Sequence, residues 1–369
     1  MSAIPIQPKL RRKFQPLRDA KIVLDLVSAA VDSDRPLITH LVITRRCNLS
    51  CGYCFEYDKV SKPVPLDVLK QRIDHLAKLR SVFVTLTGGE SLLHPDAIEL
   101  VRYVREQGMT PFLNTNGYLL TRSIIEGLNE AGLYGLQLSI DNARPNDVSK
   151  KSLKPLMPKL RLLAQYAKFH VRINTVLGSS PPEEALEVAR TVVAFGFDSN
   201  CSLVRDETGA LIQPDPRTRA AYEEIRGLGR RLPAFLDDDF TQKLLDQGSM
   251  QWKCRAGART FMVCENGLVH LCQPRMGKPR HAAARVHRRR HPAGLRCAEA
   301  VRREVPDRVC PPREQARRLA LATGSAAARS RAPRGLRQAQ SGTRRGRVGQ
   351  LAAIQVSSLG SVAFIARRT

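Results

Sequence analysis

The sequence predicts an α/β fold in which a parallel sheet forms a partial (β/α)6 barrel of the TIM-like kind. Six strand-like apolar runs alternate with helix-like stretches from residue 38 to about residue 231. The runs are apolar along most of their length, which is typical of parallel strands that are buried on both faces. Parallel neighbours need right-handed crossovers, and a helix after each strand supplies them.

Each predicted element follows from a local pattern. The expected strands are Ile38–Thr44, Val82–Thr87, Pro111–Thr115, Gly135–Ile140, His170–Leu177 and Asn200–Val204. The expected helices lie near residues 65–79, 95–107, 121–131, 153–168, 182–195 and 217–231, and several begin at a Pro or Thr start signal. In a parallel barrel, functional side chains are expected at the carboxyl ends of the strands.

Composition limits the class of protein and its compartment. With 43% hydrophobic residues, the chain of 369 residues can bury a large core. No apolar run reaches the length of a membrane span, and the basic N-terminus is not followed by the apolar stretch of a signal peptide. We therefore expect a cytoplasmic protein whose nine cysteines are metal ligands or buried thiols rather than disulfides.

The formal net charge of +26 suggests a nucleic-acid partner, but most of this charge lies in one segment. Residues 277–369 contain 22 basic and 4 acidic residues, and the rest of the chain is only mildly basic. Binding of single-stranded nucleic acid needs aromatic side chains among the charges for base stacking. The basic segment has one Phe and no Trp or Tyr, so we expect no nucleic-acid partner.

Three cysteines follow the first predicted strand, namely Cys47, Cys51 and Cys54. Thiolates are soft ligands that select zinc, copper(I) or iron–sulfur clusters. Three thiols on one loop can hold three irons of a cubane cluster and leave the fourth iron open, whereas ferredoxin clusters take four cysteines. Zinc sites and structural thiols also cluster in this way, so the cysteines alone leave these alternatives open.

The spacing of the cysteines, with the aromatic Tyr53 before the last one, resembles the radical S-adenosylmethionine (SAM) superfamily. The resemblance implies a 4Fe-4S cluster on Cys47, Cys51 and Cys54, with an open iron that binds the amino and carboxylate groups of SAM. It implies one-electron cleavage of SAM to methionine and a 5′-deoxyadenosyl radical, with a reducing partner such as flavodoxin or ferredoxin. Tyr53 resembles the family aromatic whose backbone or ring lies against the adenine.

Polar motifs follow the next two predicted strands. Gly88 and Gly89 let the backbone come close to a ligand, and the Glu90 carboxylate can accept from an ammonium group. This resembles the family's GGE motif, which binds the methionine amine of SAM; a plain Gly-Gly turn is the alternative. Asn116 follows the third strand, where its side chain would point into the barrel mouth, although Asn116–Gly117 is also typical of a turn.

The fourth and fifth predicted strands add three candidate SAM contacts. Ser139 and Asp141 resemble a family motif that hydrogen-bonds the ribose or the carboxylate of SAM, and we expect Ser139 rather than Asp141 to make the direct contact. Asn174 lies within the apolar fifth strand, where a buried polar side chain needs a partner. A structural hydrogen bond and a SAM contact would both satisfy it. The sequence identifies no catalytic residue for the second substrate.

Beyond the predicted barrel, two short apolar runs flank the turn at residues 265–267 and predict a β-hairpin. Cys254 and Cys272 lie at its two ends. This arrangement resembles the start of a SPASM/Twitch extension, in which a hairpin and its cysteines hold an auxiliary iron–sulfur cluster. Cys254 and Cys272 are therefore candidate remnants of such a site, and a hairpin with buried thiols is the alternative.

The predicted organisation has four parts. They are a helical N-terminal extension (1–37), the barrel (38–235), the hairpin extension (236–278) and an Arg/Ala-rich tail (279–369). The resemblance implies a radical SAM enzyme that modifies a peptide or a small molecule. A radical SAM enzyme of lipid or cofactor biosynthesis is one alternative, and an electron-transfer iron–sulfur protein, which needs no SAM site, is another.

The tail has the composition of an aberrant reading frame. After Lys278 it contains no lysine, Trp or Tyr and no sustained hydrophobic period, so we expect it to be disordered. Dropping one base near Pro279 converts Val301, Val305 and Val309 into cysteines if each is encoded by GTG. The resulting C-x-x-x-C-x-x-x-C array would supply ligands for an auxiliary cluster. We therefore predict a frameshifted C-terminal domain, with a genuine basic tail as the alternative.

Overall fold

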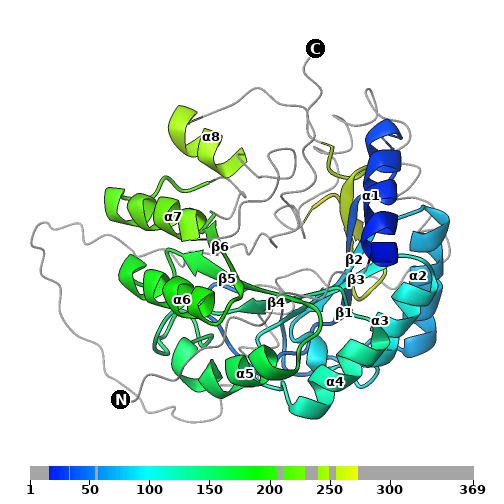
Figure 1. Ribbon diagram of the computed structural model, residues 1–369, viewed down its shortest axis with the longest axis horizontal. Coiled ribbons are helices and arrows are strands. Elements are labelled where there is room, and N and C mark those ends of the chain that lie inside the picture. The colour runs from blue at the N-terminus through cyan, green and yellow to red at the C-terminus, as the bar shows by residue number, and fades with distance from the viewer. Residues whose placement is uncertain are drawn as a thin grey trace, which may run out of the picture. The chain divides into compact units, whose positions relative to one another are not determined.

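An eight-stranded sheet forms the centre of the computed structural model, which describes residues 16–32, 34–54, 57–205, 211–228, 240–248 and 255–272 (Figure 1). The strand order is β6-β5-β4-β3-β2-β1-β7-β8, and β1 to β6 are all parallel. The sheet does not close, because β6 and β8 are its two edges. The predicted α/β fold with a partial parallel barrel is confirmed.

The strands and helices alternate as the sequence predicts, each within three residues of its expected ends. The strands are β1 (Ile38–Thr44), β2 (Phe83–Gly88), β3 (Thr110–Thr115), β4 (Gly135–Ser139), β5 (His170–Leu177) and β6 (Asp198–Leu203). The helices between and after them are α2 (Leu66–Lys78), α3 (Ala97–Glu106), α4 (Arg122–Ala131), α5 (Leu153–Tyr166), α6 (Pro182–Ala194) and α7 (Pro216–Leu228). A short 3-10 helix, η1 (Ser91–Leu93), and helix α8 (Phe240–Gln247) were not predicted.

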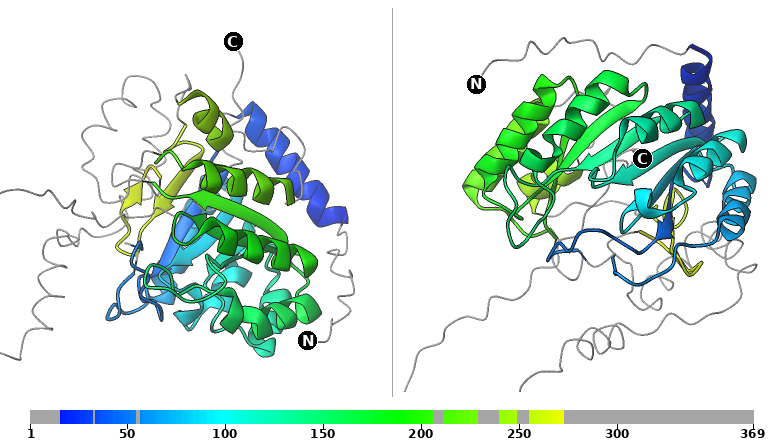
Figure 2. Two further views of the ribbon diagram at one scale, coloured as in Figure 1. Left: turned by 90° about the vertical axis from the view of Figure 1, so that its left-hand side faces the viewer. Right: turned by 90° about the horizontal axis from the view of Figure 1, so that it is seen from below.

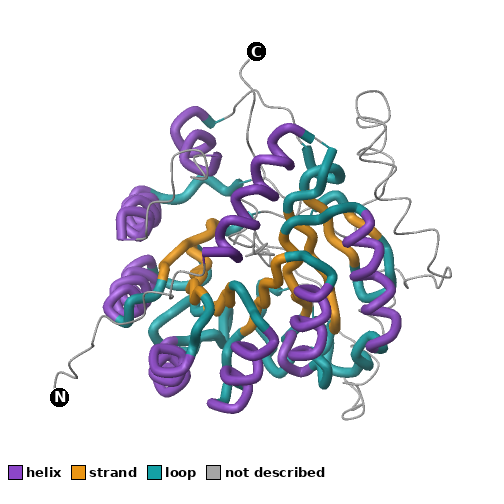
Figure 3. The backbone as a smooth tube through the Cα atoms, turned by 45° about the vertical axis from the view of Figure 1, so that its right-hand side comes forward, coloured by secondary structure: helices purple, strands orange, loops and turns teal. Residues whose placement is uncertain are grey.

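Alternate residues of each strand serve two different environments. Helices α2 to α7 lie along the outer side of the curved sheet (Figures 1 and 3). In β4, Leu136 and Leu138 point to this side and join the core with Leu156 and Leu160 of α5. The intervening residue Gln137 and the following Ser139 line a cleft on the inner side. The outer residues therefore hold the helices, and the inner ones are available to a ligand.

The predicted hairpin forms, but it is also part of the main sheet. β7 (Thr260–Val263) and β8 (Val269–His270) pair antiparallel and are drawn in yellow in Figure 2. β7 pairs in parallel with β1, from Ile38 opposite Thr260 to Leu41 opposite Val263. The hairpin therefore extends the barrel sheet beyond β1.

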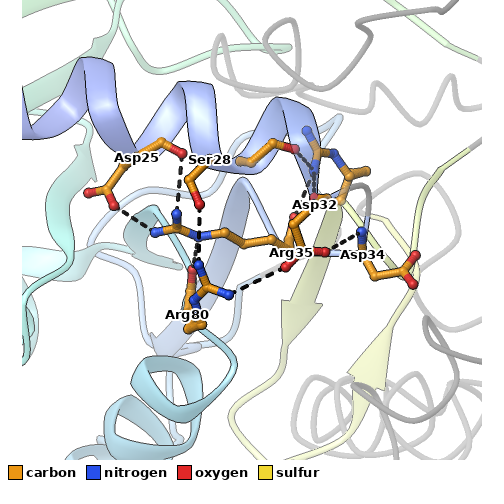
Figure 4. Close-up of polar contacts among 8 residues, drawn as sticks. Asp25, Ser28, Asp32, Asp34, Arg35 and Arg80 are labelled. Carbon is orange, nitrogen blue, oxygen red and sulfur yellow. Dashed lines mark hydrogen bonds and ion pairs between the residues drawn. The ribbon is translucent and has the colours of Figure 1, made fainter.

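Helix α1 (Pro16–Val31) is fixed to the sheet by arginines (Figure 4). Arg35 donates to the Asp25 carboxylate at 2.7 Å, and this ion pair is largely buried. Nη1 of Arg259 donates to the carbonyl oxygens of Ala29, Asp32 and Arg35. A cationic donor at the end of a helix satisfies carbonyls that have no partner within the helix.

None of the described helices is long and apolar enough to cross a membrane. Two predictions lie outside the described residues, namely those for Cys254 and for the tail at 279–369.

Candidate functional site

A cleft opens at the carboxyl ends of the parallel strands, where functional residues were expected. It encloses about 620 Å³ of space, part of which is open solvent. The cysteine loop and the ends of β2, β3 and β4 supply its lining: Cys47, Leu49, Cys51, Cys54, Tyr57, Thr87, Gly88, Gly89, Asn114, Thr115, Asn116, Gln137, Ser139 and Lys151.

All three predicted cluster ligands line this cleft. Cys51 is buried, and Cys47 and Cys54 are half-buried. The Cys47 sulfur accepts from the Leu49 N–H at 3.4 Å, and the Cys51 sulfur accepts from the Lys150 N–H at 3.5 Å. Burial raises the pKa of Cys47, and the Leu49 N–H opposes this effect. Backbone N–H groups aimed at sulfur are favourable to thiolates and thus to metal ligation.

The donor set fits a cluster better than a single ion. Among the residues that the structure describes, no three His, Cys, Asp or Glu side chains converge as ligands of one metal ion would. A cubane takes one thiolate per iron, so three thiols spread along the wall of one cleft suit it.

The two glycines at the end of β2, Gly88 and Gly89, are required by the chain's own backbone. A Cβ on Gly88 would collide with the carbonyl oxygen of Thr44, and a Cβ on Gly89 would collide with those of Arg45 and Arg46. The Gly89 N–H donates to the Thr44 carbonyl at 2.9 Å. The absence of side chains therefore lets the end of β2 pack against the start of the cysteine loop, beside the cleft that both glycines line.

Glu90 lies behind the cleft wall rather than in it. Its side chain is buried, and its carboxylate accepts from the Thr115 hydroxyl at 2.6 Å and from the N–H groups of Asn116 and Leu92 at 2.7 and 3.0 Å. Burial raises the pKa of Glu90, while these hydrogen bonds lower it. Three donors leave about one of the four lone-pair sites of the carboxylate for a ligand.

Three of the predicted SAM contacts lie at the carboxyl edge of the sheet but differ in their access to the cleft. They are Ser139, Asn116 and Asn174. Ser139 and Asn116 line the cleft, and Asn116 donates to the Asn48 side chain at 2.7 Å. Asn174 is fully buried beside Ser139 in the strand register. Its oxygen accepts from the side chains of Asn200 and Ser202, and its Nδ2 has no partner among the described residues. A buried amide donor without an acceptor is costly, so a ligand oxygen or a water would stabilise it.

Tyr53 and Asp141 form a buried bridge outside the cleft lining. The Tyr53 hydroxyl donates to Asp141 at 2.5 Å, and the same carboxylate accepts from the Ser149 hydroxyl at 2.6 Å and from the Val176 N–H at 3.2 Å. Burial, followed by the charge of Asp141, raises the pKa of Tyr53 well above its usual value. The bridge ties the cysteine loop to the ends of β4 and β5.

Lys151 is a cleft residue that the sequence analysis missed. Its ammonium group donates to the Tyr53 hydroxyl at 2.9 Å. Burial by itself lowers the pKa of Lys151, but Tyr53 and Asp141 raise it well above its ordinary value. Lys150–Lys151 in the sequence is typical of a solvated surface. The available signal was its place in the loop after β4, at the carboxyl edge of the sheet.

The hairpin cysteines contribute less to the described site. Cys272 is half-buried just after β8, and Cys264 is buried near Val42 and Met262. Since Cys254 is outside the described residues, the arrangement expected for an auxiliary cluster stays a prediction.

The structure thus combines an open parallel sheet with three thiols in a cleft at the carboxyl edge of that sheet. Residues 41–210 match the family described as the Radical SAM superfamily, and this match includes the three cysteines of the cleft. The superfamily uses a 4Fe-4S cluster and SAM.

Curated proteins are similar to this chain in sequence, and a solved structure is similar to it in fold. The chain is 30% identical to the AdoMet-dependent heme synthase of Methanosarcina barkeri, over 52% of this chain and 57% of the relative. It is 36% identical to the PqqA peptide cyclase of Bradyrhizobium diazoefficiens, over 28% of each chain. It therefore spans less than two thirds of either relative. The fold resembles that of Streptococcus suis SuiB bound to its precursor peptide SuiA, with a TM-score of 0.53 and 15% identity over 75% of this chain and 69% of SuiB.

Proposed function

We propose that this chain holds a 4Fe-4S cluster on Cys47, Cys51 and Cys54 and reductively cleaves SAM to a 5′-deoxyadenosyl radical. The observation that carries the proposal is the presence of all three thiols in one cleft with the ends of β2, β3 and β4. The bound cluster supplies the electron that breaks a carbon–sulfur bond of SAM. The residues of the chain bind SAM, orient it and limit its contact with water.

The cleft, together with buried residues behind its wall, offers SAM complementary polar groups. The remaining acceptor site of Glu90 suits the ammonium group, and the buried Nδ2 of Asn174 offers a donor to an oxygen. Ser139 and Asn116 present side chains from neighbouring strand ends. In this proposal Asp141 and Tyr53 act by holding the cysteine loop, because the Tyr53 hydroxyl donates to the Asp141 carboxylate and so joins the loop to the end of β4.

We propose a peptide or a small molecule as the second substrate, and a flavodoxin or ferredoxin as the reducing partner. The names of the relatives include a peptide cyclase and a heme synthase, which support both substrate classes. Thr87, Asn114 and Gln137 also line the cleft and would meet the substrate with hydrogen-bonding groups.

The test is SAM cleavage by the anaerobically reconstituted full chain under dithionite. Wild-type protein is expected to release 5′-deoxyadenosine, and a variant with Cys47, Cys51 and Cys54 all changed to Ala is expected to release none. Cys201→Ala is the matched control, because that thiol is buried against α7 and lies outside the cleft lining. Unchanged cleavage in the triple variant would refute the proposal.

A further inference from the structure

The loop between β4 and α5 places a half-buried cation, Lys151, in the lining of the cleft that contains the three thiols. Lys151 lines the same cleft as Cys47, Cys51 and Cys54, and its ammonium group interacts electrostatically with the last two. It lies 5.1 Å from the centre of the Tyr53 ring while it donates to the hydroxyl of that ring.

Several contacts hold the Lys151 backbone and side chain in place. The Asp141 N–H donates to the Lys151 carbonyl at 2.9 Å, and the Asp141 carboxylate accepts from the Tyr53 hydroxyl that in turn accepts from Lys151. The Asn146 side chain accepts from the Ser149 N–H at 2.7 Å, which shapes the loop just before Lys151. The charge of Lys151 therefore occupies a defined position rather than a range of rotamers.

A fixed positive charge beside a thiolate-bound cluster has a predictable effect. One-electron reduction adds one negative charge to the cluster and its thiolates. A nearby cation stabilises the reduced form more than the oxidised form, and this stabilisation raises the reduction potential. The interaction is strong in a partly buried cleft, because solvent screens it less there than at the surface.

The preceding lysine provides a natural contrast. The Lys150 ammonium group donates to the Asn146 carbonyl and pairs with Asp147, whose side chain is fully exposed. Only the backbone N–H of Lys150 contacts the Cys51 sulfur, and a side-chain substitution leaves it in place. Lys150 and Lys151 therefore carry the same charge one residue apart, and of the two residues Lys151 lines the cleft and Lys150 does not.

We propose that Lys151 is a positioning residue that sets the reduction potential of the cluster, held in place by Tyr53 and Asp141. The inference rests on the proposed function, since it requires a 4Fe-4S cluster on the three cysteines. As a consequence, the electron donor can reduce this cluster at a higher potential than it could without the charge of Lys151.

The test is an EPR-monitored redox titration of the reconstituted full chain with dithionite as the reductant. For Lys151→Gln, which keeps a donor but loses the charge, the ratio of reduced to oxidised cluster at a fixed potential is expected to fall about tenfold, or ~59 mV for a one-electron couple. Lys151→Arg is expected to restore the ratio. Lys150→Gln is expected to change it less than about twofold, because its charge is screened.

The midpoint potential distinguishes an effect of the Lys151 charge from a loss of cluster caused by structural damage. Each EPR signal is normalised to its own fully reduced amplitude, and Lys151→Met serves as a second neutral variant if Lys151→Gln loads less iron. A midpoint potential of the neutral variants equal to that of Lys150→Gln would overturn the inference while leaving the proposed function intact. A wild-type chain that forms no cubane would instead overturn the proposed function.

Discussion

Substitution of Gly89 by Ala tests how the site is assembled. The new Cβ would lie 2.5 Å from the Arg46 carbonyl oxygen and closer still to that of Arg45. Both contacts are backbone atoms, so no side-chain rotation relieves them. Overpacking of this kind costs about 1–3 kcal/mol, and the weakened Gly89 and Glu90 N–H bonds to Thr44 and Arg46 add about 1 kcal/mol. We expect Gly89→Ala to lower the free energy of unfolding by about 2–4 kcal/mol.

The assay is urea denaturation of the apo protein, with Gly52→Ala as the matched control. Gly52 also lies in the site region, but a Cβ there would come no closer than 3.6 Å to the Asp147 carbonyl oxygen and 3.8 Å to that of Val148, which are ordinary van der Waals contacts. Gly52→Ala is therefore expected to change the free energy of unfolding by less than about 0.5 kcal/mol. Equal stabilities of the two variants would refute the steric account of the glycine pair.

Three further predictions address binding, pH and the reading frame. Glu90→Gln is expected to weaken equilibrium SAM binding about ten- to a hundredfold with unchanged iron content, since a hydrogen bond to a charged group contributes about 1.5–3 kcal/mol. Glu99→Gln on α3 is the control. Equal SAM affinities of the two variants would show that Glu90 does not bind SAM. Burial lowers the pKa of His40 to about 4, so the unfolded chain binds the proton more tightly and stability is lost as the pH falls from 6.5 towards 4. The loss in denaturation experiments should be about 3 kcal/mol and smaller in His40→Gln, and an equal loss in both proteins would exclude His40 as its cause. Resequencing of the gene should reveal the extra base near Pro279, and codons other than GTG at Val301, Val305 or Val309 would contradict the frameshift.

The alternation of strands and helices was predictable because it depends on local patterns. β1 and β5 have the expected bounds, since β-branched and other apolar residues make up most of each strand. Helix α4 is capped at its start by Thr121, whose hydroxyl accepts from the Ile124 N–H, and at its end by Gly132, which has a positive φ. Each of these signals is contained in a few neighbouring residues.

Features that depend on distant contacts were not predictable in the same way. The pairing of β7 with β1 joins residues that are more than two hundred positions apart, and no local pattern specifies it. The steric reason for Gly88 is a carbonyl from another strand. Lys151 has the sequence context of a surface lysine, and only the fold turns it towards Tyr53. The full set of residues that form a site at a sheet edge can therefore be identified only from the packed structure.

The most direct test of the central claim is the EPR spectrum of the dithionite-reduced, reconstituted full chain with and without SAM. Binding of SAM to an open iron changes the surroundings of the cluster that Cys47, Cys51 and Cys54 would hold in the cleft. We predict about one cubane per chain and a spectrum that shifts when SAM is added. A cubane spectrum that is identical with and without SAM would contradict the account and would favour an electron-transfer protein.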